Sequence, residues 1–224
     1  MQKHLSILSS NQYRNLPVNP NYQLVECYLA QTHNVMSKAF AQHPRSIVFH
    51  AELRFPKSYQ CSMADNECLS RFIASFKEQV CAELKTRAKS GCRVHKTAVR
   101  YVWCREQSSS KNVHYHVFFL MNGDSFRNYG DLSNPMRGQL CYMLNIAWCR
   151  ALHIEQNPCS GLVHFPGPIM RININELNPT KSYDEFMKVD ATPLESVAHW
   201  ISYLSKIDTK QYGQGRRSFG CSQK

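Results

Sequence analysis

The sequence lacks several patterns that would point directly to a function. Its ten cysteines include no C-x-x-C pair, which argues against a zinc ribbon or knuckle. There is no Walker loop, no glycine fingerprint for dinucleotides and no G-x-S-x-G element, so the common nucleotide-binding and serine-hydrolase signatures are missing. Internal repeats and low-complexity segments are also missing.

Signals for export or membrane insertion are missing as well. The first residues, Met1-Gln2-Lys3-His4, are polar, and no run approaches the roughly 20 apolar residues that span a bilayer. We therefore expect a cytoplasmic protein with no membrane partner and with reduced thiols. Cysteines set among apolar residues, such as Cys81, Cys104 and Cys141, are expected to be small core side chains.

Acidic residues are scarce relative to basic ones. The chain has 16 Asp and Glu against 27 Lys and Arg, a formal net charge of +11. This excess favours a polyanionic partner, most often nucleic acid, although a merely basic protein is the alternative. With 43% hydrophobic residues, the chain can still bury a substantial core.

The hydrophobic periodicity predicts the order helix, strand, helix, strand, strand, helix, strand, helix. This order indicates an α+β fold with a mainly antiparallel central sheet flanked by helices. We expect an N-terminal lead-in and helix over 1–44, an α+β domain over 45–210 and a basic tail over 211–224. The expected helices cover 22–42, 67–89, 136–152 and 194–206, and the expected strands cover 46–56, 97–106, 113–121 and part of 161–175, with polar connections at 107–112 and 178–192.

The stretch from Val113 to Leu120 places two histidines one residue apart on a β-branched and aromatic strand. Alternate side chains of a strand share a face, so His114 and His116 point the same way. An antiparallel hairpin would bring Glu106, at the end of the preceding strand, beside them. Two imidazoles and a carboxylate suit a divalent metal with open positions. A solvated Glu at a strand end is the alternative.

A second group lies on the last predicted helix. Positions three and four apart share a helix face, so His199, Tyr203 and Lys206 should cluster. A tyrosine can be a covalent nucleophile when a base, metal or cation stabilises its phenolate, and Lys206 could hold a phosphate or the leaving oxygen. Each motif is weak alone, and Tyr203 could equally be a helix-surface tyrosine.

Other sites fit less well. A cupin site needs a Glu soon after His-x-His, and residues 117–123 contain none. An RNA-binding sheet could use Tyr101, Trp103 and Tyr115 as stacking surfaces, but these aromatics also suit a core.

The order of the motifs resembles the HUH endonuclease superfamily, and within it the YagK/YfjJ C-terminal domain, or inovirus replication-protein-like, family of bacterial prophages. The resemblance covers about residues 45–224 and is specific only in combination. It is carried by the stretches 49–56, 113–123, 161–166, 202–206 and 217–222.

The resemblance implies an HUH/ferredoxin-like fold and a rolling-circle replication initiator. Its Mg²⁺ or Mn²⁺ would be held by His114, His116 and, less securely, Glu106. Tyr203 would attack single-stranded or origin DNA and form a 5′-phosphotyrosine intermediate, with Lys206 assisting. Host helicase or other replication proteins are candidate partners. The alternative is a non-catalytic DNA-binding module on the same fold.

Two features depart from the family pattern. His199 stands where two-tyrosine relatives carry their first tyrosine, so a single-tyrosine enzyme is expected. The apolar stripe of the last helix, which includes Ile201 and Leu204, projects away from Tyr203, so that helix would have to bridge two elements.

The basic tail has its own expected role. It is expected to track DNA by charge and stacking, unless it is simply a flexible basic terminus. The residues assigned to this role are Lys210, Tyr212, Arg216, Arg217 and Phe219.

Overall fold

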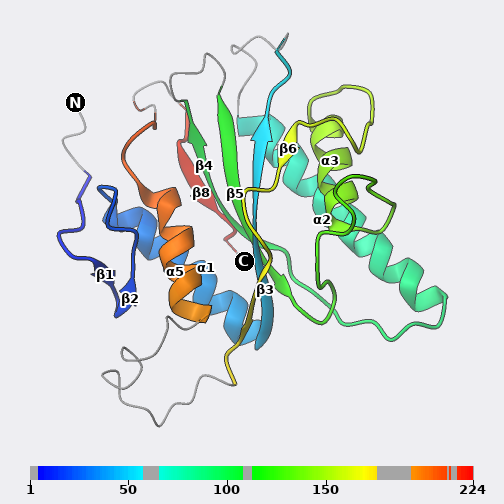
Figure 1. Cartoon of the computed structure of the whole chain (residues 1–224), viewed down its shortest axis with the longest axis horizontal. Helices are drawn as coiled ribbons and strands as arrows, with labels where there is room; N and C mark the ends of the chain where they lie inside the picture. Colours follow the sequence, from blue (N-terminus) through cyan, green and yellow to red (C-terminus); the bar gives the residue numbers. More distant parts are fainter. Residues whose placement is uncertain are drawn as a thin grey trace.

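The protein is a three-layer α+β structure in which helices cover both faces of a central sheet (Figure 1). The computed structural model describes residues 5–57, 66–107, 113–175, 193–210, 212 and 216–223. The helices are α1 (Glu26–Gln42), α2 (Asn66–Lys89), α3 (Leu140–Ala151), α5 (Pro193–Ser202) and the 3-10 turn η2 (Tyr203–Ser205). The strands are β1 (Gln12–Tyr13), β2 (Leu16–Pro17), β3 (Arg45–Arg54), β4 (Arg100–Glu106), β5 (His114–Asn122), β6 (Val163–His164), β7 (Met170–Asn173) and β8 (Phe219–Cys221).

The main sheet has six strands in the order β6-β3-β5-β4-β8, with β7 pairing with the other half of β3. Every pairing among these described strands is antiparallel. The predicted β4–β5 hairpin is present and pairs Glu106 with His114. On its other side, β5 pairs with β3 so that His116 faces Glu52. The expected α+β architecture with a mainly antiparallel sheet is confirmed.

One face of the sheet packs on α2 and α3. Ile47, Phe49 and Leu53 of β3 point to this face and contact a core that includes Phe72 and Trp148. These side chains are fully or almost fully buried, and each contributes roughly 1.5–3 kcal/mol by leaving water. This layer makes the rigid base on which the opposite face is built.

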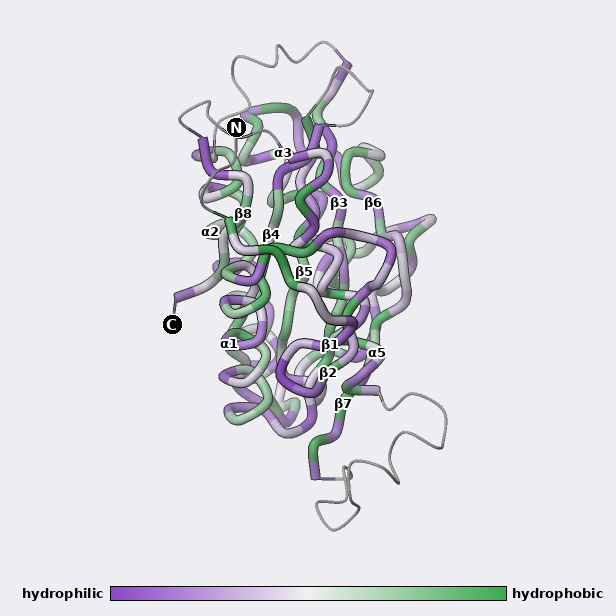
Figure 2. The backbone as a smooth tube through the Cα atoms, turned by 90° about the vertical axis from the view of Figure 1, so that its left-hand side faces the viewer, coloured by the Kyte–Doolittle hydropathy of each residue, from purple (hydrophilic) through white to green (hydrophobic). Residues whose placement is uncertain are grey.

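The opposite face packs on α1 and α5. Val48 of β3 and Phe118 and Leu120 of β5 point here and meet Val35 of α1 and Ile201 of α5. Because strand side chains alternate, this is also the face that carries His114 and His116. Figure 2 shows the hydrophobic β4 and β5 segments running through the middle of the molecule.

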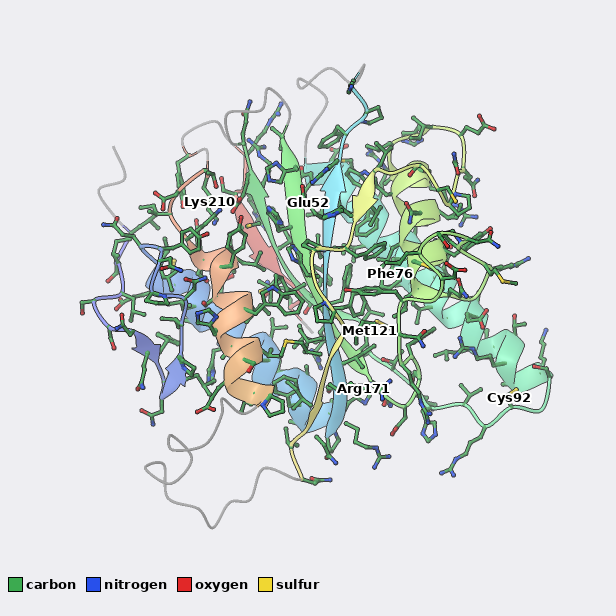
Figure 3. The ribbon with its side chains drawn as sticks, in the orientation of Figure 1. Glu52, Phe76, Cys92, Met121, Arg171 and Lys210 are labelled. Atoms are coloured by element: carbon green, nitrogen blue, oxygen red, sulfur yellow. The ribbon has the colours of Figure 1, made fainter. Side chains whose placement is uncertain are left out.

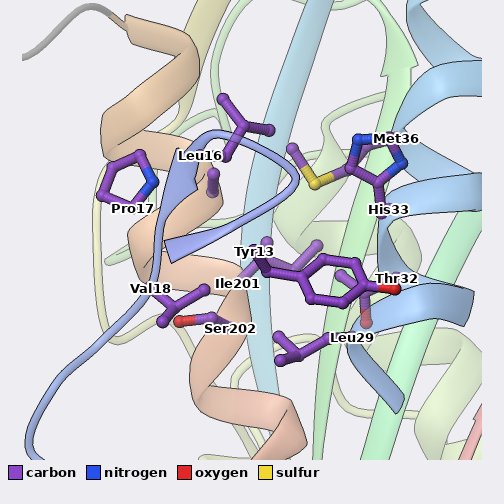
Figure 4. A pocket seen from close by; sticks show the side chains of 11 residues that line it. Tyr13, Leu16, Pro17, Val18, Leu29, Thr32, His33, Met36, Ile201 and Ser202 are labelled. Atoms are coloured by element: carbon purple, nitrogen blue, oxygen red, sulfur yellow. The ribbon is translucent and has the colours of Figure 1, made fainter. Parts of the chain in front are cut away.

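A short N-terminal ribbon closes the seam between α1 and α5. Strands β1 and β2 pair antiparallel and cover a small cavity of about 20 Å³. Figure 4 shows Tyr13 and Leu16 of the ribbon beside Met36 and Ile201. The described residues 5–44 therefore pack on the same sheet as the rest of the described chain. Within the described ranges, no helix has the length and apolar character needed to cross a bilayer.

Three helix boundaries differ by four residues from the sequence-based expectation. Helix α3 begins at Leu140 rather than 136, because Gly138 adopts a φ of +91° that a helix cannot contain. Helix α1 begins at Glu26 rather than 22, because Leu24 and Val25 form β-bridges. The last helix ends at Ser202 and tightens into the 3-10 turn η2.

The C-terminal segment is part of the sheet and not simply a basic tail. Strand β8 pairs with β4, where Phe219 faces Cys104. Phe219 is 7% exposed and stacks on Tyr28 of α1 at 4.3 Å between ring centroids. The predicted connections at 108–112 and 178–192, together with tail residues 211, 213–215 and 224, lie outside the described residues.

Candidate metal and nucleophile site

Three of the predicted site residues meet where β4 ends and β5 begins. Glu106 and His114 are direct partners in the hairpin, and His116 lies two residues along the same face. One ligand atom from each lies within 4.8 Å of the other two. Glu106 and His116 are buried, and His114 is half-buried. This Glu/His/His group could bind a metal ion.

The spacing and donor types fit a divalent ion. In a tetrahedral site with ligands ~2.1 Å from the ion, neighbouring ligand atoms are ~3.4 Å apart, so ligand atoms at the 4.8 Å limit would have to move about 1 Å closer together. Two imidazoles and one carboxylate leave further positions open, as a metal that acts on a substrate requires. The mixed nitrogen and oxygen set suits Mn²⁺ at least as well as Mg²⁺.

Glu106 is the centre of a buried ionic network. Its Oε2 atom lies 3.0 Å from Lys206 Nζ and 3.5 Å from His116 Nε2, and its Oε1 atom lies 3.8 Å from Lys210 Nζ. Burial alone would raise the pKa of Glu106, but His116, Lys206 and Lys210 together hold it far below the ordinary value. The carboxylate is therefore ionised, and it is already paired with two ammonium groups.

Tyr203 is the fifth member of this network. Its hydroxyl donates to Glu106 Oε2 at 3.1 Å and accepts from Lys206 Nζ at 2.6 Å. Its ring meets the His116 ring edge-on at 5.3 Å between centroids. Burial, and then the charge of Glu106, raise the pKa of Tyr203 above its ordinary value. The structure thus brings Tyr203, Lys206 and the three candidate ligands together.

The 3-10 turn explains how Tyr203 reaches the histidines. The apolar side chains of α5 and η2, including Ile201 and Leu204, are buried against the sheet. Helix α5 ends before Tyr203, so the projection of an ideal α-helix does not apply there. With three residues per turn, Lys206 eclipses Tyr203, and its Nζ lies 4.0 Å from that ring.

His50 was not among the predicted site residues. It sits on β3 opposite Phe118, and its Nε2 atom is 3.0 Å from His116 Nδ1. This contact leaves only Nε2 of His116 available as a ligand. Burial, and then the neighbouring His116, lower the pKa of His50 to about 2. His50 is therefore neutral, and its ring stacks on Phe118 at 4.4 Å between centroids.

Glu52 was also missed and flanks the site on the β3 side. It faces His116 across the β3–β5 pair, and its carboxylate receives a 2.7 Å bond from Arg54 and lies 3.6 Å from His164. Figure 3 labels Glu52 and Lys210 at the same end of the sheet. The signal for both missed residues was the polar face of the predicted 46–56 strand, on which His50, Glu52 and Arg54 alternate.

Other predicted residues are placed differently. The expectation that Cys81 is a core side chain is wrong, because it lies beside the buried stripe of α2 and is exposed. His199 is exposed on α5 rather than joined to Tyr203. The Lys210 side chain is 0% exposed and donates to the Lys206 carbonyl, so it supports the site and does not present a DNA-contacting surface. Phe219 is buried in β8, which likewise removes it from the surface.

The remaining tail residues lie at the β4–β8 edge. Arg216 and Arg217 line a groove of about 880 Å³ that also exposes part of Tyr101 and Trp103. Tyr212 is half-buried, and burial, followed by Tyr28, raises its pKa. Tyr115, one of the proposed RNA-stacking residues, is fully buried, and Trp103 is 8% exposed. The idea of an open aromatic sheet for RNA is therefore wrong.

Comparison with known proteins places the chain in a family. Residues 9–222 match the YagK/YfjJ C-terminal domain. The chain belongs to the YagK/YfjJ C-terminal domain family. YagK of Escherichia coli (strain K12), an uncharacterized protein, is 28% identical over 207 residues, which cover 88% of this chain and 92% of YagK. YfjJ of the same strain, also uncharacterized, is 26% identical over 209 residues, which cover 88% of this chain and 94% of YfjJ.

Among solved structures, the N-terminal nuclease domain of non-structural protein 1 from minute virus of mice is distantly similar. It is 12% identical, with a TM-score of 0.25, over 86% of this chain and 78% of that domain. That viral domain coordinates Zn²⁺ in its active-site pocket and recognises DNA at the origin of replication. At this TM-score the likeness carries no argument for the present chain.

Proposed function

We propose that this protein is a metal-dependent nickase and strand transferase for single-stranded DNA, of the HUH type. It would act as a prophage-type rolling-circle replication initiator in the cytoplasm of a bacterial host. One observation carries the proposal: the Tyr203 hydroxyl lies 3.1 Å from a carboxylate of the Glu106, His114 and His116 group. Tyr203 lies about 90 residues or more after these three residues in the sequence. Its contact with Glu106 therefore does not follow from local chain geometry.

The proposed reaction is a transesterification at one phosphodiester of single-stranded DNA. A divalent ion held by His114, His116 and Glu106 would supply a Lewis acid that polarises the scissile phosphate. The Tyr203 oxygen attacks phosphorus, and the bond from phosphorus to the 3′ oxygen breaks. The tyrosine proton is lost and the 3′ oxygen gains one, so the step is balanced in protons. The products are a 5′-phosphotyrosine link and a free 3′-hydroxyl.

Lys206 and Glu106 have defined tasks in this scheme. Burial keeps Tyr203 protonated, and Glu106 Oε2 is its hydrogen-bond acceptor. Lys206 Nζ, at 2.6 Å from the hydroxyl, lowers the cost of negative charge on the tyrosine oxygen and is positioned to hold the phosphate or the leaving oxygen. If Glu106 held a metal through Oε2, its contacts with Tyr203 and Lys206 at that atom would loosen. Ligand binding would thereby release the nucleophile.

The DNA strand would reach the site along the β4–β8 edge. Arg217 is exposed and Arg216 is half-exposed, and both line the 880 Å³ groove. The hydrogen bond from Arg105 N to Ser218 O fixes this segment beside the strand that ends at Glu106. Guanidinium groups at this position would neutralise backbone phosphates without reading sequence. Host replication proteins would then supply strand separation.

The proposal is tested with single-stranded DNA that contains candidate origin hairpins. Incubation with Mn²⁺ should give a covalent protein–DNA adduct that survives denaturing electrophoresis and leaves a free 3′-hydroxyl. Tyr203→Phe should abolish the adduct. Tyr142→Phe, a partly buried tyrosine on α3, is the matched control and should retain it. An adduct that persists in Tyr203→Phe would remove the assigned nucleophile.

A non-catalytic DNA-binding module is the second candidate, and one observation favours it. Glu106 is already neutralised by two buried ammonium groups, which oppose the approach of a dication. Calorimetric titration with Mn²⁺ separates the two candidates. Binding that disappears in His114→Ala/His116→Ala supports the nickase. No binding by the wild type, or equal binding by the double variant, supports the module.

A further inference from the structure

A second groove lies at the other end of β4 from Glu106. It runs between α2 and the segment that leads into β4 and has a volume of about 800 Å³. The length of β4, from Arg100 to Glu106, separates it from the metal site by ~20 Å along the strand. Figure 3 labels Cys92, just after α2, far from Lys210 and Glu52. The apolar lining consists of Val80, Cys81, Leu84, Ala88, Val94, Ala98 and Val99.

The charges of this groove have one sign. Lys77, Lys85, Lys96 and Arg100 line it, and none of the described lining residues carries a carboxylate. Lys77, Lys85 and Lys96 are all exposed, and the Lys77 Nζ atom lies 5.3 Å from the centre of the Tyr101 ring. Burial, and then Arg100, lower the pKa of Lys77. Such a cluster of cations is stabilised by an anionic partner.

Arg100 has unused hydrogen-bonding capacity at the groove. Its Nη2 atom donates to Gln42 Oε1 at 2.8 Å. Its Nε and Nη1 atoms are buried, and neither has a hydrogen-bond partner in the described part of the chain. A buried donor without an acceptor costs roughly 1–3 kcal/mol of desolvation, and a carboxylate is the acceptor that a guanidinium binds best.

The lining also distinguishes a peptide from a nucleic acid. Single-stranded nucleic acids are held by aromatic side chains on which the bases stack. All apolar lining residues here are aliphatic or cysteine, and none of the described lining residues is aromatic. Aliphatic surface flanked by ammonium groups instead matches apolar side chains alternating with carboxylates.

We propose that this groove docks an acidic peptide segment of a partner protein, with apolar side chains of that segment seated on the aliphatic floor. The carboxylates of the segment would pair with Lys77, Lys85, Lys96 and Arg100. The docking does not depend on the nickase reaction, because the groove and the metal site share no residue. A DNA-processing site and a separate protein-docking groove could then be used at the same time.

The test uses the full chain and fluorescein-labelled synthetic peptides, with binding measured by fluorescence anisotropy. A short peptide of repeated Glu-Glu-Leu should bind, and added salt should weaken it. A Gln-Gln-Leu peptide lacks the charge and a Glu-Glu-Ser peptide lacks the anchors, so neither should bind comparably. Lys85→Gln/Lys96→Gln changes two exposed side chains and should lower the affinity for the Glu-Glu-Leu peptide roughly tenfold or more.

Arg137→Gln/Arg150→Gln is the matched control, because it removes two exposed cations outside the groove. It should leave peptide binding unchanged. The proposal is overturned if no peptide binds, if the control variant weakens binding as much as the groove variant, or if Glu-Glu-Ser binds as well as Glu-Glu-Leu. It is also overturned if Lys85→Gln/Lys96→Gln weakens the binding of a thymidine oligonucleotide and leaves the binding of the peptide unchanged.

Discussion

Replacing Glu106 by glutamine should destabilise the protein strongly, because the carboxylate neutralises two buried ammonium groups. The side chains of Glu106, Lys206 and Lys210 are 2%, 7% and 0% exposed, and the pairs lie at 3.0 and 3.8 Å. Glutamine keeps the shape and an acceptor oxygen but removes the charge. Breaking one buried pair typically costs roughly 3–5 kcal/mol, so Glu106→Gln should lower the free energy of unfolding by about that amount.

The assay is equilibrium unfolding in urea at neutral pH, followed by the fluorescence of the buried Trp148. A second variant, Lys210→Met, supplies the other half of a double-mutant cycle. In Glu106→Gln/Lys210→Met, the more deeply buried ammonium group is removed together with its carboxylate partner. The free energy of unfolding of this double variant should therefore exceed that of Glu106→Gln by at least about 2 kcal/mol. Glu67→Gln is the control, because its pair with Arg71 spans 3.7 Å at a side chain that is 81% exposed. That change should cost less than about 1 kcal/mol.

The instability of Glu106→Gln should depend on pH with a definite sign. Burial already lowers the pKa of Lys210 below its ordinary value, and removing Glu106 lowers it further. The folded variant can therefore shed this proton at a lower pH than the unfolded chain. Its instability should be greatest near neutral pH and should decrease as the pH rises toward the ordinary pKa of lysine. A loss below about 1 kcal/mol, or no recovery in the double variant, would refute the ionic network.

Further predictions test other parts of the structure. His50→Phe should weaken Mn²⁺ binding roughly 10–100-fold in calorimetry, because His116 loses the partner of its Nδ1 atom, whereas equal affinity would exclude a positioning role. His50 has a folded pKa of about 2, so its contribution to stability is complete above pH ~6.5 and is lost at up to about 1.4 kcal/mol per pH unit below it. Between pH 7 and pH 5, the free energy of unfolding should fall less in His50→Phe than in the wild type. The titratable or charged groups that face His50 are His116, Glu106 and His164. Phe219→Ala should cost roughly 3–5 kcal/mol in urea unfolding, because the ring is 7% exposed and stacks on Tyr28. A loss of only a few tenths of a kcal/mol would mean that β8 is not part of the folded sheet.

Local patterns were enough to predict the α+β architecture, the hairpin and the meeting of Glu106 with His114. These depend on alternation along one strand and on a short turn, and both are visible in a single sequence. Helical spacing made Tyr203 a candidate nucleophile, and the family likeness linked it to the histidine strand. The position of His50 against His116 was not predictable in this way, because it depends on the register of β3 against β5, which are distant in the chain.

The tail shows a second limit of sequence reasoning. Lys210 and Phe219 have the composition of a solvated basic terminus, yet Lys210 is held by the Glu106 carboxylate and Phe219 by pairing with β4. Only the tertiary partners reveal these roles. Likewise, the change from α5 to a 3-10 turn at Tyr203 redirects a side chain that ideal helical spacing would place elsewhere.

The turn that carries Tyr203 is anchored by the opposite end of the chain. Val25 N donates to Ser205 O and Ile207 N donates to Gln23 O, each at 2.9 Å. Tyr203 therefore reaches its position only when segments about 180 residues apart have closed on each other, which is among the slowest kinds of contact to form. During synthesis, the histidine strand leaves the ribosome long before Tyr203 exists. A partly made chain would therefore contain the candidate metal ligands but lack Tyr203, the proposed nucleophile.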